Sequence, residues 1–220
     1  MKFSIDLKIV LFIIIFYFTK QLDIYLIVMI FAVIHELSHM ICGIILKFKP
    51  EEIRLMSLGL RISFKTNFKD YNRKIKKANI YELKKIVVAL VGPIVNIIIA
   101  LIFLNYKIFP KYNDIIIYAN FLIAIFNLIP IYPLDGGRVI KGILHIFVGN
   151  YKSKRITNTI TNVFMIFFTA LSSIAIYYYK NIAILFIIIY LWLIVIKENI
   201  KYTKQIKIYN ILKSIENNKN

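Results

Sequence analysis

The chain has 220 residues, 60% of them hydrophobic, and a formal net charge of +18 at pH 7. A water-soluble domain could not bury this much apolar surface, so the composition indicates a protein that crosses a membrane several times. The basic residues lie between apolar runs, which is typical of membrane topology and argues against nucleic-acid binding. Cys42 is the only cysteine, which excludes an internal disulfide.

Six apolar segments predict an all-α polytopic membrane protein with about six transmembrane helices. In chain order they are Ile5–Thr19, Leu22–Leu46, Ile86–Tyr106, Ile115–Leu134, Val163–Tyr179 and Ile182–Ile196. No small-residue cleavage site follows the first segment, so we expect a retained helix rather than a signal peptide. We expect residues 1–196 to form one membrane domain and residues 197–220 to form a basic tail.

The uneven distribution of basic residues predicts the orientation of the chain. All but four of the 29 Lys and Arg residues fall in the N-terminal segment, in two predicted loops at 47–85 and 138–155, or in the tail. Because basic loops stay on the cytoplasmic side, both termini are predicted to be cytoplasmic. The abundance of Ile, Lys and Asn is typical of an AT-rich bacterial genome, so we expect a bacterial cell membrane.

A short stretch after the second apolar segment alternates in the manner of a strand. Within the segment Ile53–Phe64, apolar residues recur at every second position from Met56 to Phe64. This period predicts a short membrane-associated β-hairpin that turns at residues 57–59. The basic stretch that follows is expected to be helical from about Tyr71 and to lie on anionic lipid headgroups.

The second apolar segment contains the sequence His35-Glu36-Leu37-Ser38-His39. Residues four apart share one helix face, so both imidazoles can reach a single metal ion. Glu36 lies beside them, where its carboxylate could take a proton from a metal-bound water. Ionisable groups inside a membrane helix are costly and indicate a functional site.

A catalytic zinc ion needs a third protein ligand and an open coordination position. Asp135 is the candidate ligand, because two prolines and two glycines between residues 130 and 137 interrupt the helix where this carboxylate appears. Irregular backbone at membrane depth is tolerated where it lines a cavity. The alternative is an ordinary helix end with Asp135 as a solvated cap. We expect Cys42 to be apolar filler and His145 to be a solvated loop residue.

Three elements together resemble the signature of the site-2 proteases, the intramembrane zinc metalloproteases. They are His35–His39, then Gly92-Pro93-Ile94-Val95-Asn96, then Asn127 and Pro130 before Leu134-Asp135-Gly136. The motifs cover roughly residues 22–140. The sequence around Asp135 most resembles the stage IV sporulation protein FB subgroup, whose members cleave a membrane-associated transcription-factor precursor.

The resemblance implies one Zn²⁺ per chain, held by His35, His39 and Asp135, with Glu36 as general base. It also implies an intramembrane zinc metalloendopeptidase that cleaves a membrane-associated protein with a zinc-activated water.

Three further residues are expected to bind substrate. The resemblance places Asn96 near the metal, where it would help to hold substrate or the oxyanion. Asn127 is expected to contact substrate, and so is Gly59 in the hairpin, where a strand edge could pair with an unwound substrate segment. Two alternatives stay open. The Asn96 amide could cap backbone carbonyls freed by Pro93, and the hairpin could be an interfacial structure without this role.

The expected partners are a membrane-associated protein substrate and the lipid bilayer, with control by a regulatory membrane protein or by substrate supply. In a spore-former the membrane would be the one around the forespore. No outer loop is long enough for a substrate-filtering domain, and the tail is too short for a nucleotide-sensing domain.

Other functions fit the sequence less well. Membrane peptidases that process prenylated C-termini typically take a downstream Glu as third ligand, and here the later glutamates lie in loops or the tail. A membrane metal transporter or sensor could use the same His/Asp cluster, but transporters usually contain a repeated half or a path of polar groups. An inactive relative would lack Glu36 or a ligand, and all four residues are present.

Overall fold

The apolar runs fold into helices, as expected for backbone that must satisfy its own hydrogen bonds in lipid. The computed structural model describes residues 2–5, 8–56, 59–64, 75–180 and 183–217. Two units separate by their internal contacts, Met1–Ile129 and Pro130–Asn220, and each is described by itself. The described chain is predominantly helical, which confirms the predicted all-α membrane fold.

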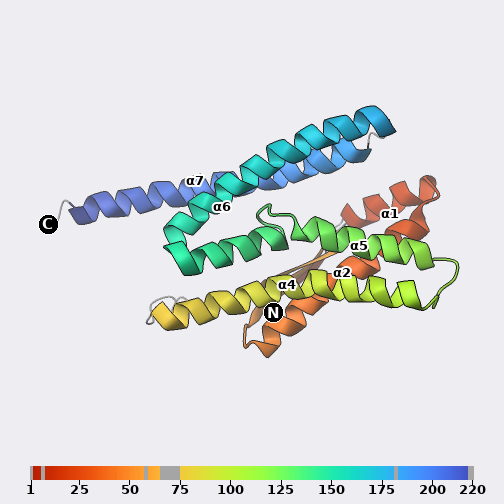
Figure 1. The fold of residues 1–220 in the computed structure, drawn as a ribbon, viewed down its shortest axis with the longest axis horizontal. Helices are drawn as coiled ribbons and strands as arrows, with labels where there is room; N and C mark the ends of the chain where they lie inside the picture. Colours follow the sequence, from red (N-terminus) through yellow and green to blue (C-terminus); the bar gives the residue numbers. More distant parts are fainter. Residues whose placement is uncertain (1, 6–7, 57–58, 65–74, 181–182, 218–220) are drawn as a thin grey trace. The chain divides into compact units, whose positions relative to one another are not determined.

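The described residues of the first unit form the helices α1 (Lys8–Phe18), α2 (Leu22–Ile45), α4 (Ile75–Asn105) and α5 (Asn113–Leu128) (Figure 1). The helices α2, α4 and α5 pack on one another in all three pairings. The start of α4 at Ile75 agrees with the helix expected in the basic stretch, whereas residues 65–74 lie outside the described part of the chain.

A small sheet completes this unit. Strand β2 (Pro50–Met56) pairs antiparallel with β3 (Gly59–Phe64), with Ile53 opposite Ile62. The predicted hairpin is therefore present, although its turn residues 57–58 lie outside the described residues. The sequence did not predict β1 (Lys2–Ile5), which pairs parallel with β2. The first helix consequently begins at Lys8, and the assignment of Ile5 to that helix was wrong.

Where the second unit is described, two long helices pack side by side and run antiparallel (Figure 1). They are α6 (Asp135–Tyr179) and α7 (Ala183–Asn217). A kink interrupts α6 at Gly149, whose φ of 82° lies in the region that glycine adopts without strain. The basic segment 138–155 was expected to be a loop and is helical instead, because charged side chains do not by themselves break a helix.

Three helices in the described part of the chain are long and apolar enough to cross a membrane. They are Leu22–Ile45, Asn79–Asn105 and Asp135–Tyr178, and the shorter apolar helix Asn113–Leu128 accompanies them. The fourth predicted segment ends at Leu128 and not at Leu134, since the prolines after it leave residues 129–134 outside any helix. The total of six spans and the division at residue 196 stay predictions.

The helices of the first unit carry their polar groups inward and their apolar side chains outward. His35, His39, Asn96 and Asn120 are all at most 3% exposed, and the same helices expose many large apolar residues. Ile30, Ile94 and Leu122 are examples, with exposed fractions of 55%, 48% and 67%. A lipid-facing exterior accounts for this distribution, and polar groups enclosed by such helices indicate a functional site.

Candidate metal centre

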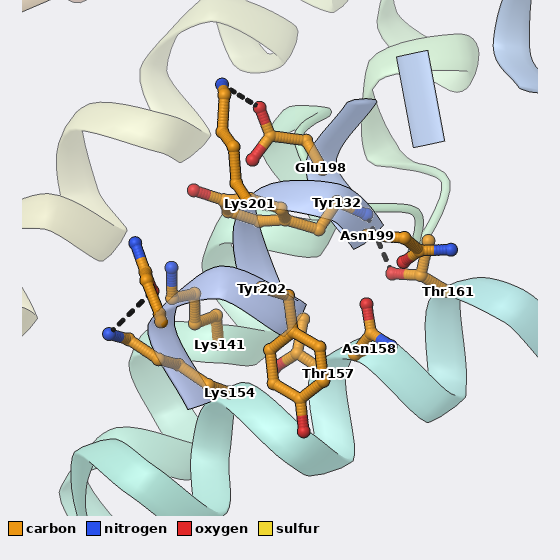
Figure 2. Close-up of a pocket in the computed structure, with 11 residues that line it drawn as sticks. Tyr132, Lys141, Lys154, Thr157, Asn158, Thr161, Glu198, Asn199, Lys201 and Tyr202 are labelled. Atoms are coloured by element: carbon orange, nitrogen blue, oxygen red, sulfur yellow. Dashed lines mark hydrogen bonds and ion pairs between the residues drawn. The ribbon is translucent and has the colours of Figure 1, made fainter. Parts of the chain in front are cut away.

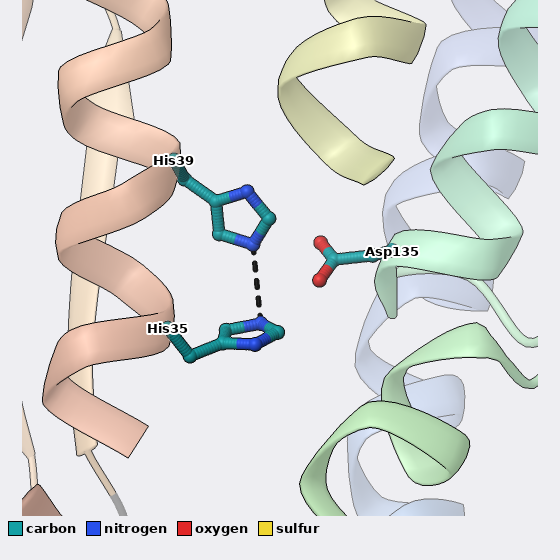
Figure 3. A group of neighbouring side chains, drawn as sticks. All are labelled: His35, His39 and Asp135. Atoms are coloured by element: carbon teal, nitrogen blue, oxygen red, sulfur yellow. Dashed lines mark hydrogen bonds between the residues drawn. The ribbon is translucent and has the colours of Figure 1, made fainter. Parts of the chain in front are cut away.

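Two histidines on the inner face of α2 form the centre of the site. His35 and His39 are one helical turn apart and each is 3% exposed. Their rings meet edge to face, and their Nε2 atoms lie 3.1 Å apart (Figure 3). The two nitrogens that can bind a metal therefore point at nearly the same place.

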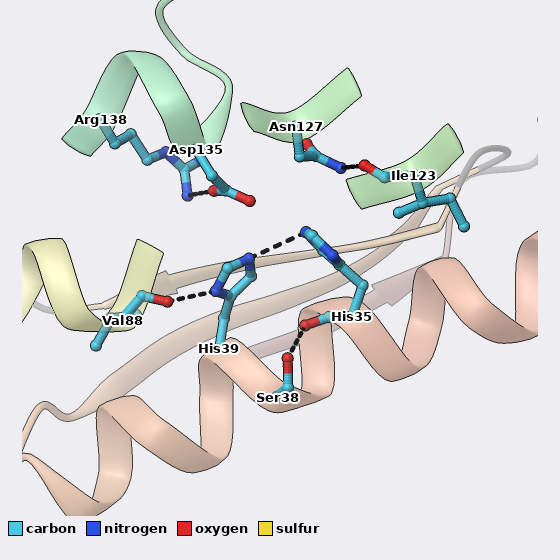
Figure 4. A network of polar contacts seen from close by, with 8 residues as sticks. All are labelled: His35, Ser38, His39, Val88, Ile123, Asn127, Asp135 and Arg138. Atoms are coloured by element: carbon cyan, nitrogen blue, oxygen red, sulfur yellow. Dashed lines mark hydrogen bonds and ion pairs between the residues drawn. The ribbon is translucent and has the colours of Figure 1, made fainter. Parts of the chain in front are cut away.

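The other nitrogen of each ring faces an oxygen atom (Figure 4). The Nδ1 atom of His39 lies 2.6 Å from the backbone carbonyl oxygen of Val88 on α4. A carbonyl only accepts hydrogen bonds, so Nδ1 of His39 carries the proton and donates. The neutral ring then keeps its lone pair at Nε2, which is the form that binds metal.

A chain of two amides defines the same tautomer for His35. Its Nδ1 atom lies 2.7 Å from Oδ1 of Asn96. Nδ2 of Asn96 donates a hydrogen bond of 2.8 Å to Oδ1 of Asn120. Nδ2 of Asn120 in turn donates a hydrogen bond of 2.9 Å to the carbonyl oxygen of Ile116. Because that carbonyl only accepts, the direction of each hydrogen bond in the chain is determined. Nδ1 of His35 is therefore the donor, and its Nε2 keeps the lone pair.

The helix α4 approaches the histidines closely because residue 92 has no side chain. A Cβ atom at Gly92 would lie 2.8 Å from Cε1 of His35 and closer still to Nε2 of His39. Pro93, which follows, is fully buried. The Gly-Pro pair thus permits the close contact that brings the Val88 carbonyl and the Asn96 amide to the two Nδ1 atoms.

Asp135 is the first residue of α6, and its side chain is buried. Oδ1 accepts a hydrogen bond of 3.3 Å from Nη1 of Arg138 (Figure 4). Asp135 belongs to the unit Pro130–Asn220 and the two histidines to the unit Met1–Ile129, so its place as the third ligand stays a prediction. Two neutral imidazoles and a carboxylate are a donor set that suits zinc and leaves a position for water.

Glu36 is half-buried and follows His35 on α2. The hydroxyl of Ser38 donates to the backbone oxygen of His35 at 2.5 Å. Asn127, on α5, donates from Nδ2 to the carbonyl of Ile123 in its own helix (Figure 4), and Gly59 is the first residue of β3. The roles of these residues in catalysis or substrate binding stay predictions.

The structure brings Asn96 against His35, and the nitrogen of its amide donates to Asn120 rather than to the carbonyls near Pro93. Sequence reasoning missed the carbonyl of Val88, which bonds to His39, and Asn120, which bonds to the Asn96 amide. A backbone carbonyl leaves no trace in a sequence. An asparagine in an apolar helix was the one available sign for Asn120.

Two comparisons with known proteins found matches for this chain. The profile of Peptidase family M50 matches residues 105–171. The fold is similar to that of a solved structure, the site-2 protease from Methanocaldococcus jannaschii, with 20% sequence identity and a TM-score of 0.63. The similarity covers 90% of this chain and 91% of that one. A search of curated protein sequences found no significant match.

The profile match covers less than half of the chain, and the structural similarity concerns the fold. The helices form the all-α membrane fold seen in the archaeal site-2 protease, and the Peptidase family M50 match together with that fold supports a metalloprotease. Within the first unit, His35 and His39 are potential metal ligands, because both imidazoles are buried and their Nε2 atoms lie 3.1 Å apart.

Replacing Gly92 with alanine tests the close approach of α4. The added Cβ would collide with both imidazoles, so we expect the affinity for Zn²⁺ to fall by at least about 10-fold, as when the surroundings of metal ligands are disturbed. Zinc affinity is measured by competition with a chromogenic chelator in detergent micelles. Gly43→Ala is the control, because its Cβ would meet the movable ring of Phe64. Equal affinities for the two variants and wild type would contradict the packing argument.

Asn96→Ala removes the acceptor for Nδ1 of His35. The buried N–H group would then lack a partner, a loss that typically costs about 1–3 kcal/mol, and zinc affinity should fall by about 10–100-fold. Side-chain ¹⁵N NMR of the metal-free protein should show a mixture of tautomers for His35. Asn105→Ala is the matched control, because this exposed asparagine on α4 bonds only to its own helix at Leu101. A single unchanged tautomer of His35 in Asn96→Ala would disprove that the Asn96 amide determines this tautomer.

Proposed function

We propose that this protein is a zinc-dependent endopeptidase that cuts a membrane-associated protein within or near a membrane segment. The observation that carries the proposal is the pair of buried imidazoles whose Nδ1 atoms are held by acceptors. This arrangement leaves both Nε2 lone pairs for a metal, and the buried carboxylate of Asp135 completes the ligand set.

The residues of the site divide the chemistry among them. Bound zinc would supply a Lewis acid that lowers the pKa of a water to about 7 and polarises the scissile carbonyl. Glu36 takes the proton of the attacking water and later gives it to the departing amine. Asn96 and Val88 hold the two imidazoles in the tautomer that leaves Nε2 available. Asn96 then acts as a positioning residue through His35 rather than by direct contact with substrate.

The sheet supports a route by which an extended substrate could bind. The strand order is β1-β2-β3, so within the described residues β3 has one edge without a strand partner. A substrate segment unwound from its helix could add to this edge through backbone hydrogen bonds. In this proposal Gly59, at the start of β3, lets the substrate backbone approach, and Asn127 contacts the substrate from α5.

The sequence supports a location and a substrate class for this activity. The basic segments favour cytoplasmic termini in a bacterial cell membrane. The likeness of the Asp135 motif to the stage IV sporulation subgroup favours a transcription-factor precursor as substrate, in the membrane around a forespore. Identification of the substrate tests this part of the proposal.

Glu36→Gln should abolish proteolysis while zinc stays bound, because the amide cannot accept the proton but does not disturb the ligands. We would compare protein N-termini in membranes that contain wild type with those that contain Glu36→Gln. A new N-terminus beside a membrane segment, found only with wild type, would support proteolysis and name the substrate. Its presence with both proteins would remove Glu36 from the mechanism.

Asp135→Ala should lose both zinc and activity, since two imidazoles alone bind zinc poorly. Zinc content after dialysis is measured by atomic emission, together with the cleavage assay. Asp114→Ala serves as the control, because this carboxylate is exposed at the start of α5. Full zinc occupancy in Asp135→Ala would exclude Asp135 from the ligand set.

A further inference from the structure

A second polar site lies within the unit Pro130–Asn220. A cavity of about 70 Å³ is lined by Tyr132, by residues of α6 on both sides of the kink, and by the middle of α7 (Figure 2). Three lysines and one glutamate line it: Lys141, Lys154, Lys201 and Glu198. The metal centre and its proposed chemistry use none of these residues.

The single acid of the cavity is already neutralised. Oε1 of Glu198 accepts a hydrogen bond of 2.6 Å from Nζ of Lys201 in the same helix (Figure 2). The other two lysines have neutral partners. Nζ of Lys154 donates to Oε1 of Gln205 at 3.1 Å, and Nζ of Lys141 lies 4.3 Å from the centre of the Tyr132 ring. In the described part of the chain, neither Lys141 nor Lys154 forms an ion pair, so the cavity carries uncompensated positive charge.

A buried hydroxyl gives independent evidence for a ligand. Thr157 is 3% exposed and lines the same cavity, and its Oγ1 has no hydrogen-bond partner among the described residues. Buried hydroxyl groups are nearly always paired, and an orphan one indicates a missing partner. In Figure 2 the side chain of Thr157 lies between Lys154 and Asn158 on α6. A ligand with acceptor oxygens would satisfy the hydroxyl and both ammonium groups together.

We propose that this cavity binds a phosphate-bearing anion through Lys141, Lys154 and Thr157. An ammonium group supplies up to three donors and a hydroxyl supplies one, which matches the several acceptor oxygens of a phosphate group. The ligand could be the headgroup of an anionic phospholipid or a soluble phosphate, since both present the same group. Basic pockets beside membrane helices are known to bind lipid headgroups.

The cavity also contacts the segment that leads into α6. The backbone N–H of Tyr132 donates to Oγ1 of Thr161 at 3.0 Å (Figure 2), and the ring of Tyr132 lies beneath Lys141. An anion held by Lys141 would therefore stabilise residues 130–134 as well as the pair of long helices. Binding should accordingly appear as a rise in the temperature of unfolding.

The test is thermal unfolding of the full chain in uncharged detergent micelles. One series adds inorganic phosphate against potassium chloride of equal ionic strength, and a second adds phosphatidylglycerol against phosphatidylcholine. We expect the midpoint to rise with phosphate, with phosphatidylglycerol or with both. The apparent Kd should weaken at least 10-fold in Lys154→Gln and Thr157→Val. Lys152→Gln is the control: it removes the same charge from an exposed position on α6 outside the cavity.

Each outcome bears on the proposal. A rise with phosphate that depends on Lys154 and Thr157 supports a soluble ligand, and a dependent rise with phosphatidylglycerol alone supports a lipid headgroup. Lys154→Arg, which keeps the charge, should retain most of the affinity even if Lys154→Gln folds poorly. The proposal is overturned if neither compound raises the midpoint, or if Lys152→Gln weakens binding as much as Lys154→Gln.

Discussion

Two imidazoles buried in a membrane helix must have acceptors for their Nδ1–H groups, and most of the first unit serves this requirement. Burial without acceptors would leave two polar groups unsatisfied where no water can replace the lost hydrogen bonds. The acceptors come from α4, once as a backbone carbonyl at Val88 and once as the amide of Asn96. The helix α5 then satisfies that amide through Asn120. The packing of α2, α4 and α5 therefore also determines the tautomers of the two histidines.

Gly92 makes these hydrogen bonds possible because it lets α4 pack closely against the histidines. Hydrogen bonds of 2.6 and 2.7 Å to the Nδ1 atoms require the backbone of α4 to come closer than helices with ordinary side chains allow. Gly92 removes the one Cβ that would stand between the helices, although glycine lowers helix stability by about 1 kcal/mol relative to alanine. Pro93 also disfavours a regular helix interior. Gly92 and Pro93 thus weaken α4 locally at the point where the helix packs against the histidines.

The sequence predicted the parts of the molecule that depend on local patterns. The spacing of His35 and His39 placed both rings on one face, and the period of two between Ile53 and Phe64 predicted the strands that pair as β2 and β3. Long-range pairing is harder to predict. The sheet partner β1 and the Asn96–Asn120 contact join segments far apart in the chain, and nothing in the spacing of those residues indicates that they meet. The prediction of a loop over residues 138–155 was wrong because it rested on their charge. Their helix propensity instead places them in α6, where Gly149 accommodates a kink.

Within the described chain, one edge of β3 has no strand partner, and its use by a substrate would determine which substrates are chosen. Recognition through a strand edge uses the peptide backbone, which is the same for almost every residue. A protease that worked in this way would discriminate little among side chains. It would instead respond to how readily a segment leaves its helix, a property that glycine, proline and β-branched residues change by fractions of a kcal/mol to about 3 kcal/mol each. Its targets would then share an instability rather than a consensus sequence.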